Sequence, residues 1–216
     1  MESRIQHLNQ LALDIEFLLI SVIQGVALAT LAAASLGPID ELQFEYWPYM
    51  VSGFLFVLIF WSGAINHALS FIEWPLDMGH SFLYFLASFV EVLVISHLTS
   101  PIRWFGLMLV FQIVAAILYW YDLGLIKKHI FEKSKQRLRA HVLEHHMKEL
   151  KVFIPLSLVF DLVAVAAIYF NPELFINQKY HLIFISLQGV LGLLFLVGSV
   201  RSFEKRAEMI RSQVNK

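Results

Sequence analysis

The chain has 216 residues, of which 58% are hydrophobic and only 15% are charged, and its mean hydropathy is +0.68. Soluble domains carry about 25% charged residues, so this composition excludes an ordinary soluble or nucleic-acid-binding domain and indicates an integral membrane protein. The chain contains no cysteine, which excludes disulfides, thiolate metal sites and cysteine nucleophiles.

Six segments are apolar enough to cross a bilayer, which takes roughly 20 helical residues for about 30 Å of hydrocarbon. In chain order they are residues 17–36, 46–67, 81–98, 102–121, 152–170 and 180–200. The first segment resembles a signal peptide, but its apolar stretch is too long and acidic residues precede it, so we expect a retained helix. The sequence therefore predicts a single all-α domain, a polytopic membrane bundle of six transmembrane helices.

The Lys and Arg residues are concentrated on one side of these spans. Of the 16 in the chain, all but Arg103 and Lys179 precede the first span, follow the sixth, or lie between the fourth and the fifth. The positive-inside rule therefore predicts that the N and C termini are both cytoplasmic. We expect the protein in the plasma (inner) membrane.

The stretch 122–151 is the one long connection, and it is polar and almost free of Gly and Pro. Its apolar residues recur at steps of four, which predicts that the fourth and fifth helices extend into the cytoplasm. Basic residues of this kind contact anionic lipid headgroups and offer a docking surface for a cytoplasmic protein partner. The candidates are Lys127, Lys128, Lys133, Lys135, Arg137 and Arg139.

Two acidic residues, Glu91 and Asp161, lie near the middle of apolar spans. At 1.5 Å per helical residue both are about 15 Å from the start of their span, so they share one depth. A carboxylate at this depth is costly and is usually paired, protonated or facing a water-filled path. Gln24, Gln112 and Gln188 reach similar depths. This polar layer predicts a proton or cation pathway or a polar ligand site, although hydrogen bonds between helices would use the same residues.

Histidines form one cluster in the cytoplasmic stretch, at His141, His145 and His146. Positions four apart share a helix face, so His141 and His145 could ligate one metal ion. Membrane di-iron enzymes need several such clusters, and the remaining histidines are isolated in the sequence, among them His67, His80, His97, His129 and His181. We therefore predict no cofactor, apart from the possibility of a metal at this cluster.

The first two spans carry a resemblance to a known family. The second span contains an aromatic-rich run, residues 54–61, and ends at His67, and the first contains the small-residue stretch 25–31 (GVALATL). In these features and in its six-span plan the chain resembles the six-helix lysosomal and prokaryotic transmembrane potassium channels. The resemblance implies a pore lined by the first helix. The family's Phe-Ser-Asp motif is absent, since the chain reads Ile20-Ser21-Val22 there, so no functional residue carries over.

These patterns favour a small channel or transporter for protons or monovalent cations that uses the polar layer and assembles as a homo-oligomer in the lipid bilayer. One alternative is a non-transporting sensor or accessory subunit whose basic segment binds a partner or lipid. A third is a membrane-embedded metal enzyme. The chain has no glycine-rich phosphate loop and no hydrolase motif, which favours a protein that is not an enzyme.

Overall fold

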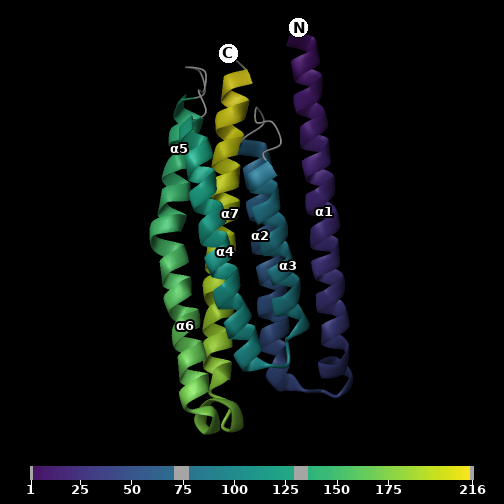
Figure 1. The fold of residues 1–216 in the computed structure, drawn as a ribbon, viewed down its shortest axis with the longest axis vertical. Helices are drawn as coiled ribbons and strands as arrows, with labels where there is room; N and C mark the ends of the chain where they lie inside the picture. Colours follow the sequence, from purple (N-terminus) through teal and green to yellow (C-terminus); the bar gives the residue numbers. More distant parts are fainter. Residues whose placement is uncertain (1, 71–77, 129–135, 215–216) are drawn as a thin grey trace.

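The computed structural model describes residues 2–70, 78–128 and 136–214, and this part of the chain forms helices without any strand (Figure 1). The elements are α1 (Glu2–Asp40), the 3-10 turn η1 (Phe44–Tyr46), α2 (Trp47–Ser70), α3 (Met78–Ser96), α4 (Pro101–Lys128), α5 (Gln136–Lys148), the π-helical turn η3 (Glu149–Phe153), α6 (Ile154–Phe170), a second π-helical turn η4 (Glu173–Asn177) and α7 (His181–Val214). The predicted all-α fold is confirmed for these residues.

Six helical segments are long and apolar enough to cross a membrane, as predicted. The fifth extends beyond its apolar stretch 152–170, because α5, η3 and α6 form one continuous helical segment, Ala140–Phe170. Large apolar side chains cover the outside of the bundle, among them Leu18, Phe82, Phe89, Val159 and Leu194. A helix that is apolar all round suits a lipid environment, whereas in water so much exposed apolar surface would cause aggregation.

The helices run up and down, so both chain termini lie at the same end of the bundle (Figure 1). Helix α2 packs against α7 and α1, and α4 packs against both α3 and α6. We call the end that carries the N and C termini the terminal end, and the other the loop end.

Polar contacts hold the loop end together. The Tyr49 hydroxyl lies 2.9 Å from His181 Nδ1, joining the start of α2 to the start of α7, and both residues are buried. Lys179 forms an ion pair with Glu45 between the two connecting segments. The hydrogen bond and the negative charge of Glu45 raise the pKa of the Lys179 amine.

Glycines allow α7 to approach α2 closely. A Cβ at Gly189 would lie 3.1 Å from Ser52 Oγ, and one at Gly192 would lie 3.4 Å from Ile59 Cδ1, whereas a Cβ at Gly198 would meet nothing within 4 Å. Small residues at such positions are a common device for bringing membrane helices together.

We expect Gly189→Val to weaken the α2–α7 contact, because the added side chain overlaps Ser52, whose hydroxyl donates to the Ile185 carbonyl. Overpacking of this kind costs about 1–3 kcal/mol. Thermal unfolding of the detergent-purified protein would measure the loss. Gly198→Val, on the same helix but in open space, is the matched control; equal losses in the two variants would contradict the packing argument.

Most of the predicted basic docking segment cannot be placed. Lys133 and Lys135 lie outside the described residues, as do the side chains of Lys128, Arg137 and Arg139. Lys127 is exposed at the terminal end of α4. Lipid or partner binding by this segment remains a prediction.

Candidate functional site

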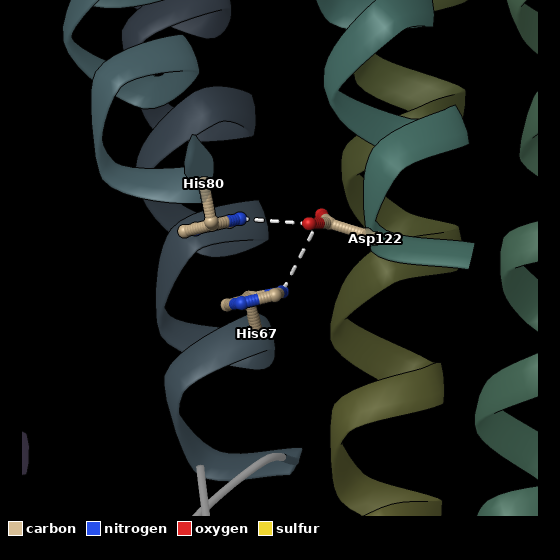
Figure 2. A group of neighbouring side chains, drawn as sticks. All are labelled: His67, His80 and Asp122. Atoms are coloured by element: carbon tan, nitrogen blue, oxygen red, sulfur yellow. Dashed lines mark hydrogen bonds and ion pairs between the residues drawn. The ribbon is translucent and has the colours of Figure 1, made fainter. Parts of the chain in front are cut away.

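Three polar side chains meet at the terminal end of the bundle. His67 comes from the last turns of α2, His80 from the first turn of α3 and Asp122 from the last turns of α4 (Figure 2). Asp122 Oδ1 lies 2.7 Å from His80 Nδ1, and Oδ2 lies 3.6 Å from His67 Nδ1. All three side chains are largely buried, with exposed fractions of 13%, 12% and 5% respectively. We call this group the His–Asp cluster.

The contact between His80 and Asp122 indicates which ring nitrogen of His80 carries a proton. A carboxylate only accepts hydrogen bonds, so His80 carries its proton on Nδ1 and donates it to Asp122. The rings of His67 and His80 are stacked, with centroids 4.1 Å apart and planes 4° from parallel. Both Nδ1 atoms therefore face the same carboxylate, an arrangement suited to holding and exchanging a proton.

The cluster also contains the donor atoms of a metal site. One donor atom from each of His67, His80 and Asp122 lies within 4.8 Å of the others. Imidazole binds a metal ion in the plane of its ring, however, and two parallel stacked rings cannot both have one ion in plane. One ring would have to turn before both imidazoles could ligate the same metal ion.

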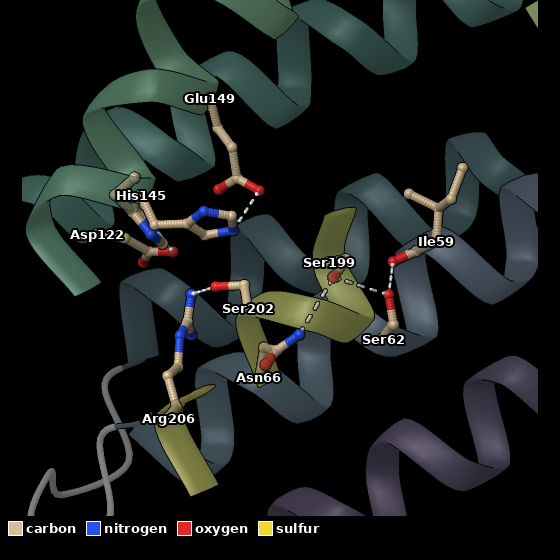
Figure 3. Close-up of polar contacts among 10 residues, drawn as sticks. Ile59, Ser62, Asn66, Asp122, His145, Glu149, Ser199, Ser202 and Arg206 are labelled. Atoms are coloured by element: carbon tan, nitrogen blue, oxygen red, sulfur yellow. Dashed lines mark hydrogen bonds and ion pairs between the residues drawn. The ribbon is translucent and has the colours of Figure 1, made fainter. Parts of the chain in front are cut away.

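Further charged groups surround the cluster (Figure 3). His146 Nε2 lies 3.9 Å from Asp122 Oδ2, and its ring stacks on Tyr119. In η3, Glu149 is buried and pairs with His145 at 3.2 Å. The guanidinium of Arg206, on α7, donates to Ser202 Oγ and interacts electrostatically with Glu149. The terminal end thus holds a buried network of both charge signs, which keeps its ionised groups compensated.

A cavity of about 360 Å³ runs from this network into the bundle, and all six membrane-length helices contribute residues to its lining. His67, His80, Asp122 and Glu149 line its terminal end, and Asp161 lines its interior. Between Glu149 and Asp161 the chain is continuously helical, so the two carboxylates are separated by roughly 18 Å along the helix axis at 1.5 Å per residue. Most of the wall between them is aliphatic and aromatic.

Asp161 belongs to a chain of hydrogen bonds. Trp104 Nε1 donates to Gln188 Oε1 at 2.9 Å, and Gln188 Nε2 donates to Asp161 Oδ1 at 3.1 Å. This chain orients the amide so that its donor faces the carboxylate. Asp161 is only 1% exposed, and its second oxygen, Oδ2, has no hydrogen-bond partner. A buried carboxylate oxygen without a partner is uncommon and points to a ligand or a proton.

Glu91 is also buried and also has one oxygen, Oε1, without a hydrogen-bond partner, but it lies away from this cavity. Gln24 Nε2 donates to Glu91 Oε2 at 3.1 Å, joining α1 to α3. Neither residue lines the cavity that contains Asp161. Helix α4 packs against both α3, which carries Glu91, and α6, which carries Asp161. The predicted polar layer therefore divides into two sets: Gln24 with Glu91, and Gln188 with Asp161. Gln112 lines the cavity with the second set.

The histidines are arranged differently from the sequence prediction. His67 and His80 are isolated in the sequence and were not expected to form a site, but the end of α2 and the start of α3 bring them together at Asp122. Of the predicted histidine trio, His146 approaches Asp122, His145 pairs with Glu149, and His141 lies one turn further from the cluster along α5. Among the described residues, the group of three potential metal ligands whose donor atoms lie close together is the His–Asp cluster. Metal binding by the predicted trio remains a prediction.

Comparisons with protein-family models, curated proteins and solved structures find no significant match to this chain. The fold and the site place the described part of the chain in a class of proteins: all-helical bundles with six membrane-length apolar helices. In this bundle a buried His–Asp cluster lies at one end, and a cavity leads from it to a buried carboxylate.

Proposed function

We propose that this chain is an integral membrane transporter that couples proton binding to the movement of a cation through its internal cavity. One observation carries the proposal: a single cavity is lined by titratable side chains at both ends, the His–Asp cluster at one and Asp161 at the other. Ionisable groups placed inside a membrane bundle and facing a cavity commonly mark ion or proton pathways.

The two ends have distinct tasks in this proposal. Both termini are cytoplasmic, as the distribution of Lys and Arg favours, so the His–Asp cluster lies at the cytoplasmic mouth. The imidazoles of His67 and His80 face one carboxylate at this mouth, which suits the cluster to pass protons between the cytoplasm and the cavity. Asp161 is the carboxylate that receives the proton or the cation in the interior.

The proposal is tested by proton flux into liposomes containing the purified protein, driven by a potassium gradient with valinomycin and followed with an internal pH-sensitive dye. We expect His80→Gln to slow the flux by about tenfold or more, since an amide can keep a hydrogen bond to Asp122 but cannot relay a proton.

His97→Gln is the control for this variant. His97 lies near the loop end, bonded to the Leu93 carbonyl and Ser96, and does not line the cavity. The His97→Gln variant should therefore give the same proton flux as the wild-type protein. Wild-type protein that gives no more flux than protein-free liposomes, under both polarities of the potential, would rule out the transporter.

A further inference from the structure

The interior end of the cavity has the features of a binding site for a positively charged group. Asp161 supplies a buried carboxylate with one oxygen unpartnered, and none of the described Lys, Arg or His side chains forms an ion pair with it. The other titratable residues that line the cavity, including Tyr84 and Tyr119, lie toward the terminal end. A carboxylate in such apolar surroundings needs either a proton or an external cation to compensate its charge.

The interior end of the cavity has few ligands for an inorganic cation. Hard cations bind through several oxygen atoms, six to eight in the case of Ca²⁺. The Gln188 side-chain oxygen accepts a hydrogen bond from Trp104, and Oδ2 of Asp161 is the carboxylate oxygen without a partner. Gln112 and Ser157 also line the cavity, so this end offers one carboxylate and a few neutral oxygens, a sparse set for a hard cation but enough to pair with an organic cation.

The walls around Asp161 suit an apolar, aromatic ligand. Trp104, Phe56, Phe111 and Phe160 all line the cavity, and rings of this kind attract cations over their faces. The volume of about 360 Å³ falls in the range of small-molecule pockets, about 300–1,000 Å³.

The cavity also reaches the outer apolar surface of the bundle. Leu156 on α6 and Leu194 on α7 line it, yet they are 54% and 64% exposed. Helix α6 packs mainly on α4 and α7 mainly on α2, so contact between α6 and α7 is sparse along this side. A ligand that partitions into the hydrocarbon of the membrane could therefore reach Asp161 between these two helices.

We infer that the cavity binds a lipophilic, monovalent organic cation, with its charge against Asp161 and its apolar body against the aromatic wall. This inference deepens the proposed function and rests on it for the role of the ligand as the transported cation. Its binding step can be measured without any transport.

The test is equilibrium dialysis of the detergent-purified protein with N-methyl-4-phenylpyridinium, corrected for uptake by empty micelles. We expect saturable binding of one cation per chain. The anion 4-biphenylcarboxylate, which has a similar two-ring frame, should bind at least about tenfold more weakly, since a charge-assisted contact is worth about 1.5–3 kcal/mol. Asp161→Asn should weaken cation binding by a similar factor, whereas Glu91→Gln should leave it unchanged.

Equal affinity for the cation and the anion would overturn the inference, and this comparison uses the wild-type protein, so it stands even if Asp161→Asn fails to fold. Proton flux without cation binding would overturn this inference but would leave the proposed proton transport standing. Charge-selective binding without proton flux, when N-methyl-4-phenylpyridinium is also supplied in the liposome assay, would support the binding site and contradict the proposed transport.

Discussion

Replacing Asp161 by Asn should reduce proton-coupled transport to the level of protein-free liposomes. Asparagine has nearly the same size and can still accept the hydrogen bond from Gln188, so the packing around α6 is retained. It cannot take up a proton or compensate a cation, and the cavity would lose its interior charge. The liposome flux assay with the pH-sensitive dye measures the effect directly.

Glu91→Gln is the matched control, because Glu91 is an acid at similar predicted depth that does not line the cavity. An amide there can still bond to Gln24, so flux should remain close to that of the wild type. If the two substitutions reduced flux equally in monodisperse protein, the two acids would act as one layer and the division drawn from the structure would be contradicted.

The second large effect is on stability. Asp122→Ala should destabilise the protein by about 1–3 kcal/mol, because the buried Nδ1–H group of His80 loses its hydrogen-bond acceptor. Asp122 is 4% exposed and faces His67, His80 and His146. Unfolding of the purified protein by heat or by titration with a denaturing detergent would give the difference.

Two further variants identify the cause of that loss. Asp122→Asn keeps an acceptor oxygen for His80 and should cost less than the alanine substitution. In a double-mutant cycle, His80→Ala should cost much less once Asp122 has been replaced by alanine, since the 2.7 Å contact is already gone. Additive losses would mean that the two side chains do not interact in the folded protein.

The sequence predicts the helices well because a membrane span is a local property. About 20 consecutive apolar residues are recognisable without knowledge of their neighbours, and so is an acid such as Asp161 in the middle of them. The His–Asp cluster depends instead on three chain segments meeting. His67, His80 and Asp122 each look ordinary at the end of a span, and their meeting follows from the way α2, α3 and α4 end at one level. The sequence does contain one clue to the cluster: all three residues lie at the ends of their spans on the predicted cytoplasmic side.

The division of the polar layer could not be predicted for a similar reason. Depth counted along a helix gives the level of Glu91 and Asp161 but not the direction in which each side chain points. That direction depends on helix rotation, which packing decides: α1 supplies Gln24 to Glu91, and α7 supplies Gln188 to Asp161. Residues at one depth can therefore belong to separate sites.

The π-helical turn η3 decides how the two ends of the cavity are aligned. In a regular α-helix, the 12-residue step from Glu149 to Asp161 would rotate the side chain by about 120° beyond whole turns, so only one of them could face the interior. A π-turn accommodates one extra residue, which removes roughly 100° of that rotation. Glu149 and Asp161 consequently line the same cavity. A single residue of helical register thus places the network at the terminal end and the interior carboxylate on the same face of the helix. Changing that register would leave both groups intact but would turn one of them away from the cavity.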